Sequence, residues 1–262
     1  KSWNQPAVSS KPWFWTLPLR LIFLKGETDV LLYIIRHGDP IYAPDSLTPK
    51  GHLQAAALAK RLAVHGLDKI FASPLVRAQQ TAKPTCELLG LDCQIEEWTS
   101  ENAAWQDLSV TNEQGRRTWA FHVQNTVMMQ DNPIREDWYD SPCFRGTNAR
   151  EGYARIVRES DRFLEKLGYR REGRVYRMVN PSEERVAVFC HQGFGTTWLS
   201  HLLQVPPMLF WSGFDITHSS ITILEFRNYP NGVTAPQCLC LSDTSHIYKE
   251  GLPLQHNNRV NL

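Results

Sequence analysis

The chain has 262 residues, of which 42% are apolar and 21% charged, and its net charge is +1. This composition excludes an intrinsically disordered chain, and a chain of this length can bury a core without disulfides. The near-neutral charge argues against a broad nucleic-acid-binding surface. The longest apolar run near a candidate strand, residues 30–35, is far shorter than the about 20 residues that span a bilayer. We therefore expect a cytoplasmic globular protein that binds neither nucleic acid nor membrane.

Residues 1–29 are predicted to form an irregular N-terminal extension ahead of a single domain over residues 30–262. The first 26 residues contain four basic side chains, no acidic one and three tryptophans. A membrane-surface or targeting role is the alternative, and Pro12 and Pro18 disfavour it because they interrupt a continuous amphipathic helix.

Strands and helices are expected to alternate through the first third of the domain. Val30–Ile35 is a continuous β-branched and apolar run, typical of a strand buried on both faces of a parallel sheet. Thr48-Pro49 is typical of a helix start, and an apolar stripe follows it. The next expected elements are a strand over 68–72, a helix capped by Ser73-Pro74 and running to about residue 89, and a strand over 91–96.

Residues 99–150 lack a clear period apart from a possible helix near 113–129, so we expect a cap segment inserted over the sheet. Regular elements then return, and they are predicted as a helix over 151–167, a strand over 185–190, a helix over 196–203 and strands over 220–226 and 238–241. This alternation predicts an α/β fold: a three-layer α/β/α sandwich with a mostly parallel central sheet and the inserted cap.

Each of two expected strands ends in a histidine, and a glycine lies one or two residues after it. The first runs into Arg36-His37-Gly38, the second into His191-Gln192-Gly193, and Arg77 lies one turn into a helix that follows a third strand. Ligands of such sheets bind beyond the carboxyl ends of the strands, so these side chains are expected to meet. Guanidinium groups match the oxygens of a phosphoryl group, which predicts a small phosphorylated substrate.

The order of four motifs resembles the histidine phosphatase superfamily, in the phosphatase-rich branch 1 of the phosphoglycerate mutase-like group. The resemblance spans about residues 30–245 and implies a phosphomonoester hydrolase that forms a covalent phosphohistidine and needs no metal or other cofactor. The alternatives are a phosphoglycerate mutase-type phosphoryl transfer, a non-catalytic phospho-ligand binding module and a metal-dependent hydrolase. The four motifs are Arg36-His37-Gly38, Leu47-Thr48-Pro49-Lys50-Gly51, Ser73 to Ala82, and His191-Gln192-Gly193.

The resemblance also implies roles for single residues. His37 corresponds to the nucleophile, because a neutral imidazole can attack phosphorus. Arg36, Arg77 and His191 correspond to the phosphate pocket, in which His191 also takes part in catalysis. Ser46 is the counterpart of an Asn or Ser that can touch the phosphate.

A general acid must protonate the leaving oxygen and then activate water. The family places a Glu on the segment after the third strand, commonly six positions beyond a strand residue. Counting from Ile95 gives Glu101, and Glu97 is the alternative. Gln192 follows the second histidine, where the family frequently has a small residue, and we assign it to the phosphate pocket.

The cysteines, the remaining histidines and the arginines of the cap carry weaker signals. The cysteines lack metal-binding spacing and are expected to be reduced thiols, and the remaining histidines likewise predict no zinc site. His218 precedes an expected strand and is an outside candidate for the rim of the pocket. The cap arginines, which are expected on its solvated surface and alternatively at distal substrate charge, are Arg116, Arg117, Arg135, Arg145 and Arg150.

Overall fold

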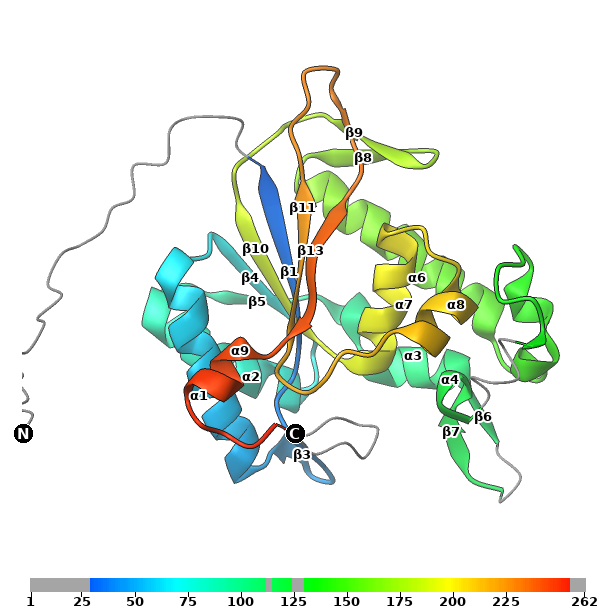
Figure 1. Cartoon of the computed structure of the whole chain (residues 1–262), viewed down its shortest axis with the longest axis horizontal. Coiled ribbons are helices and arrows are strands. Elements are labelled where there is room, and N and C mark those ends of the chain that lie inside the picture. The colour runs from blue at the N-terminus through cyan, green and yellow to red at the C-terminus, as the bar shows by residue number, and fades with distance from the viewer. Residues whose placement is uncertain (1–28, 112–114, 124–129, 255–262) are drawn as a thin grey trace, which may run out of the picture.

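The computed structural model describes residues 29–111, 115–123 and 130–254 (Figure 1). Its centre is a six-stranded sheet, whose strands in spatial order are β13 (Gln237–Asp243), β11 (Ile221–Phe226), β1 (Val30–Arg36), β10 (Arg185–Cys190), β4 (Lys69–Ala72) and β5 (Cys93–Ile95). The last four are mutually parallel, whereas β11 is antiparallel to both of its neighbours. The predicted α/β architecture with a mostly parallel sheet is confirmed.

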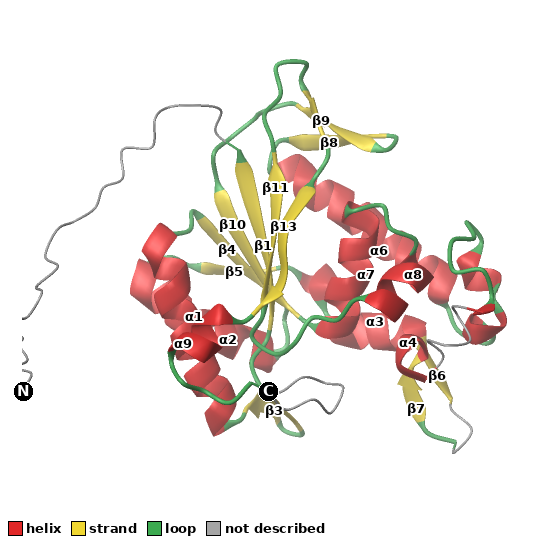
Figure 2. Ribbon diagram, viewed as in Figure 1, coloured by secondary structure: helices red, strands yellow, loops and turns green. Residues whose placement is uncertain are grey.

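Both faces of β1 are covered by helices, which explains why its sequence is continuously apolar rather than alternating. Leu32 and Ile34 pack in one core with α6 (Ala149–Lys166) and α7 (Gln192–Leu202), and Tyr33 and Ile35 pack in a second core with α1 (Pro49–His65) and α2 (Val76–Leu89). Figure 2 shows these helices as separate layers on the two sides of the sheet. Two short helices complete the layers: α8 (Pro207–Gly213) and α9 (Ser245–Lys249).

The helix boundaries follow the predicted signals with two corrections. Thr48 caps α1 as expected, and its hydroxyl accepts a hydrogen bond from the backbone N–H of Gly51. Ser73 does not cap α2, because that helix begins at Val76 with Leu75 as its N-cap. The helix expected from Thr196 begins at Gln192, directly after the strand β10 and its terminal histidine. This early start brings the first free N–H groups of α7 to the carboxyl edge of the sheet.

The segment 99–150 contains short elements that share a small core with α8. The helix expected near 113–129 is wrong over Arg117–Trp119, which is a strand (β7) paired antiparallel with β6 (Ser109–Thr111); residues 112–114 and 124–129 lie outside the described part. A helix that sequence reasoning missed, α3 (Glu101–Leu108), precedes this hairpin. The remaining elements are the 3-10 helices η1 (Glu97–Thr99), η2 (Trp138–Asp140) and η3 (Pro142–Phe144) and the helix α4 (Ala120–Val123).

Two further hairpins extend from the domain. The first, β2 (Pro40–Tyr42) with β3 (Asp45–Leu47), follows β1 near the carboxyl edge of the sheet, at the bottom of Figure 1. The second, at the opposite edge, consists of β8 (Tyr169–Glu172) and β9 (Val175–Met178) and is extended by β12 (Val233–Thr234). No helix among the described residues is both long and apolar enough to cross a bilayer. The extension predicted over 1–29 lies outside the described residues except for Asp29.

Candidate active site

The two histidines that end expected strands meet at the carboxyl edge of the sheet. Strands β1 and β10 are parallel neighbours with Arg36 opposite Cys190, and the N–H of His37 donates to the carbonyl of Cys190 at 2.9 Å. The imidazoles of His37 and His191 consequently lie with their ring centroids 5.1 Å apart. The structure thus brings together the two groups that the sequence placed at matching strand ends.

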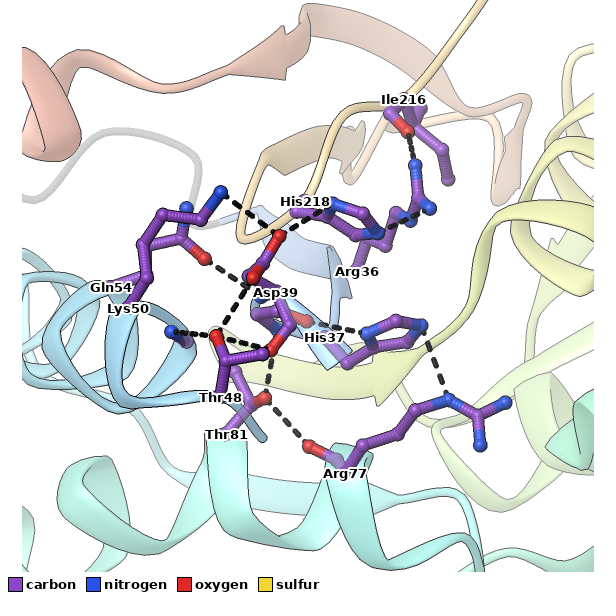
Figure 3. A network of polar contacts seen from close by, with 12 residues as sticks. Arg36, His37, Asp39, Thr48, Lys50, Gln54, Arg77, Thr81, Ile216 and His218 are labelled. Carbon is purple, nitrogen blue, oxygen red and sulfur yellow. Dashed lines mark hydrogen bonds and ion pairs between the residues drawn. The ribbon is translucent and has the colours of Figure 1, made fainter. Parts of the chain in front are cut away.

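The hydrogen bonds of His37 define which ring nitrogen is free to react. Its Nδ1 lies 2.7 Å from the carbonyl of Gly38, and because a carbonyl only accepts, Nδ1 carries the proton. Burial, followed by the nearby His191 and Arg36, holds the pKa of His37 well below its usual value. Nε2 therefore keeps a lone pair, and it accepts a hydrogen bond from Nε of Arg77 at 3.3 Å (Figure 3).

Arg77 is buried, and hydrogen bonds hold both its guanidinium and its backbone carbonyl. Its Nη1 lies 2.7 Å from the carboxylate of Asp45 on the β2–β3 hairpin. The hydroxyl of Thr81 donates to the carbonyl of Arg77 at 2.7 Å and accepts from the N–H of Gly38 at 3.0 Å. The first turns of α2 are thereby joined to the loop that carries the nucleophile candidate, so the guanidinium and the imidazole keep their relative position.

Arg36 is 4% exposed and is held by His218, the outside candidate for the rim of the pocket. Its Nη1 donates to the carbonyl of Ile216 at 2.7 Å, and its Nη2 donates to Nε2 of His218 at 2.7 Å. Burial and then the charge of Arg36 lower the pKa of His218 to about 2, which makes this ring a neutral acceptor. Nε of Arg36 is buried and has no hydrogen-bond partner among the described residues.

The position of His218 follows from the sheet topology. Strand β11 begins at Ile221, which lies opposite Ile35 near the end of β1, so the residues just before β11 lie beside Arg36 and His37. The His218 and His37 ring centroids are 5.4 Å apart. In the sequence, His218 is visible only as a histidine just before a buried strand. Its place beside Arg36 depends on the pairing of β11 with β1, which the sequence did not specify.

Asp39 lies at the other side of His218 and is itself anchored to α1. Its carboxylate contacts Nζ of Lys50 at 3.0 Å and accepts from the hydroxyl of Thr48 at 2.7 Å. Its Oδ1 is 3.9 Å from Nδ1 of His218, as Figure 3 shows. The negative charge faces the protonated nitrogen of the ring and favours the tautomer that leaves Nε2 as an acceptor for Arg36.

His191 is fully buried and is oriented by Ser73, the residue expected to cap a helix. Its Nε2 lies 2.7 Å from the Ser73 hydroxyl, while its Nδ1 has no partner among the described residues. Burial, and then the charges of Arg77 and Arg36, hold the pKa of His191 well below its usual value. Ser73 lies just after the end of β4, so its hydroxyl contacts His191 instead of capping α2.

Of the two candidate acids, the structure brings Glu101 and not Glu97 to this site. Glu101 begins α3, and its carboxylate accepts from the backbone N–H groups of Gly193 and Phe194 at 3.0 and 2.9 Å, at the N-terminus of α7. Burial raises the pKa of Glu101 and outweighs the opposing effect of these two hydrogen bonds. Glu97 lies in η1 and is exposed.

Most of these groups open into one cavity of about 640 Å³, whereas the predicted site residue His191 is not among its described lining residues. Gln192 lines it, and its side-chain amide donates to the carboxylate of Asp215. Ser46 is not among the described lining residues; it lies in β3 opposite Ile41, so the structure does not bring this predicted phosphate ligand to the cavity. The described residues that line it are Arg36, His37, Tyr42, Arg77, Glu101, Asn102, Trp105, Thr118, Trp119, Gln192 and His218.

The cap arginines do not belong to the described lining of this cavity. Arg135 pairs with Asp137 at 2.8 Å, and the guanidinium of Arg150 lies over the ring of Tyr139 at 4.9 Å. Arg117 donates to the carbonyl of Gln106. The expectation that these arginines belong to the cap surface agrees with these positions.

Solved structures of other proteins have a similar fold. A mycobacterial glucosyl-3-phosphoglycerate phosphatase is 18% identical with a TM-score of 0.56, over 81% of this chain and 98% of its own. Entamoeba histolytica phosphoserine phosphatase is 18% identical with a TM-score of 0.56, over 83% and 99%. A putative α-ribazole-5′-P phosphatase from Escherichia coli is 20% identical with a TM-score of 0.54, over 82% and 97%.

No curated protein matches the sequence. The family description "histidine phosphatase superfamily (branch 1)" matches residues 32–237, which include every residue placed in the cavity above. This match covers well over half of the sequence. The chain therefore belongs to branch 1 of the histidine phosphatase superfamily.

Proposed function

We propose that this protein is a metal-independent phosphomonoester hydrolase in which Nε2 of His37 forms a covalent phosphohistidine. The observation that carries this proposal is the fixed tautomer of His37: Nδ1 donates to Gly38, and Nε2 keeps its lone pair beside Arg77. An imidazole held in this way is nucleophilic at neutral pH, because its lowered pKa keeps it unprotonated.

The phosphoryl group binds where the positive and donor groups converge. The guanidiniums of Arg36 and Arg77 stabilise its equatorial oxygens. His191 is outside the described lining but its ring centroid is 5.1 Å from that of His37, and we assign to its Nδ1 a further hydrogen bond to the phosphoryl group. Nε of Arg36 and Nδ1 of His191 are both buried without a partner among the described residues, and a phosphoryl oxygen satisfies each of them.

The reaction proceeds in two steps that conserve atoms and charge. Nε2 of His37 attacks phosphorus, the ester P–O bond breaks, and Glu101 gives its proton to the leaving oxygen. The Glu101 carboxylate then takes a proton from water as the water oxygen attacks phosphorus and the P–N bond breaks. The products are the alcohol and inorganic phosphate. The raised pKa of Glu101 supports its role as the acid of the first step.

The test is the release of inorganic phosphate and alcohol from a panel of phosphomonoesters, with and without a strong chelator. We expect equal amounts of the two products and no effect of the chelator, since Arg36, Arg77 and His191 supply the field that a metal otherwise provides. Arg77→Ala should lower kcat/KM at least about a hundredfold, whereas the control Arg158→Ala, at an exposed helix position, should match the wild type. Activity lost on chelation and restored by zinc or magnesium would overturn the proposal, and so would isomerised substrate in place of free alcohol.

A further inference from the structure

The cavity beyond the phosphoryl-binding groups has walls that are uncharged and largely aromatic. Residues from four separate segments contribute: the β2–β3 hairpin, α3, β7 and the start of α7. Three of the six neutral side chains are aromatic. The six are Tyr42, Asn102, Trp105, Thr118, Trp119 and Gln192.

The two indoles form a rigid corner of this wall. The ring centroids of Trp105 and Trp119 are 4.9 Å apart with planes at 87°, an edge-to-face contact. Trp119 also stacks on Phe121 at 5.2 Å and 18°, and Phe121 stacks on Trp211 at 5.7 Å and 24°. The position of Trp119 is thus fixed by an aromatic stack that continues into the core of the cap, so its face does not need to be ordered when a ligand binds.

The backbone of α7 is shaped to receive Trp119. A Cβ atom at Gly193 would lie 2.5 Å from two ring atoms of the Trp119 side chain, closer than atoms approach one another. Gly193 also donates its N–H to Glu101. Because one glycine contacts both the candidate acid and the indole, the aromatic wall lies directly beside the place where the leaving oxygen is protonated.

The charges around the cavity differ between its two ends. Among the described lining residues, only Arg36 and Arg77 are cations at neutral pH, since His218 is neutral. Both guanidiniums lie at the phosphoryl-binding end, and Arg77 is already paired with Asp45. The aromatic wall itself is neutral, and the guanidinium of Arg117, outside the described lining, lies 5.9 Å from the centroid of the Trp105 ring.

We infer that the cavity selects phosphomonoesters whose alcohol carries an aromatic ring. This inference rests on the proposed hydrolase function. The phosphoryl group binds at Arg36, His37 and Arg77, and the ring lies against Trp105 and Trp119. A face or edge contact with a fixed indole contributes to binding beyond its buried area, whereas a saturated ring of the same size obtains only the area.

Two matched substrates test the inference: benzyl phosphate and cyclohexylmethyl phosphate. Both release primary alcohols, so differences in kcat/KM report on the wall rather than on the ease of bond cleavage. We expect kcat/KM for benzyl phosphate to exceed that for cyclohexylmethyl phosphate about two- to tenfold. Equal kcat/KM for the two substrates would overturn the inference while leaving the hydrolase intact.

Variants connect the preference to the indoles. Trp105→Leu should reduce the benzyl-to-cyclohexylmethyl ratio towards one, and Trp119→Leu should do the same. The control Tyr248→Leu changes an exposed aromatic residue on α9, outside the described lining, and should keep the wild-type ratio. Thermal unfolding of each variant verifies that it is folded. An unchanged ratio in folded Trp105→Leu would contradict the inference. Absence of phosphate release from both substrates and from a nitrophenyl phosphate would instead refute the proposed function itself.

Discussion

Replacing His218 by Phe removes one acceptor from the phosphoryl pocket while keeping an aromatic ring beside His37. The lost contact is the 2.7 Å hydrogen bond from Nη2 of Arg36, and because Arg36 is buried, this donor loses a partner that water does not readily replace. Such a group costs about 1–3 kcal/mol. If Arg36 aligns only in the transition state, this corresponds to a loss of about 5- to 150-fold in kcat/KM.

The assay compares His218→Phe with His218→Gln on several phosphomonoesters. Because Arg36 is proposed to bind the phosphoryl group, the loss in the Phe variant should be the same for every alcohol. The Gln variant keeps an amide oxygen that can accept from Arg36 and should recover most of the rate. A Phe variant within twofold of the wild type, or a loss that varies with the alcohol, would refute the positioning role of His218.

The same variant has a predicted effect on acid stability. The unfolded chain protonates His218 near its usual pKa of 6.5, whereas in the folded protein burial and then Arg36 lower that pKa to about 2. Between these values the unfolded state binds more protons, so the free energy of unfolding falls as the pH falls below 6.5. From pH 6.5 to 4.5 the His218 contribution is about 2.3 kcal/mol. Between pH 6.5 and 4.5, the free energy of unfolding measured with urea should fall by about this much less in His218→Phe than in the wild type. Equal falls in the two proteins would contradict the lowered pKa of His218.

Three further predictions concern the proton donor, the second histidine and the phosphoryl pocket. Glu101→Gln should lower the rate on alkyl phosphates about 10²–10⁴-fold and much less on nitrophenyl phosphate, whereas Glu97→Gln should match the wild type; the reverse pattern would exchange the two roles. Ser73→Ala should lower kcat/KM about 2- to 10-fold, because it removes the 2.7 Å contact that orients His191, and an unchanged rate would show that His191 needs no such support. Vanadate should inhibit competitively and equally with or without chelator, and inhibition that requires a metal would argue for a metal-dependent hydrolase.

The strand ends could be predicted from the sequence because they depend on local patterns. Val30–Ile35 and Arg185–Cys190 are continuously apolar, and such runs in parallel sheets end at one common edge. The shared edge of these two strands is enough to predict that His37 and His191 lie close together. The separation of Glu101 from Glu97 needed the spacing implied by the family resemblance, and it agrees with the contact between the Glu101 carboxylate and the N-terminus of α7.

The sequence could not specify interactions that depend on which strands become neighbours. His218 gains its contact with Arg36 only because β11 pairs with β1, and Ser73 meets His191 because β4 lies beside β10. In the cap, Arg117–Trp119 pairs as a strand with Ser109–Thr111, although the surrounding residues suggested a helix. Tertiary packing of Trp119 on Phe121 and against Gly193 decides that conformation, and no local period encodes it.

The central claim is that His37 carries the phosphoryl group during turnover. Phosphorus-labelled substrate, mixed rapidly with enzyme and stopped with an alkaline denaturant, provides the direct measurement. The account predicts label on the peptide that contains His37, and no label and no turnover in a folded His37→Ala variant. Label on another residue, or substantial turnover by His37→Ala, would contradict it.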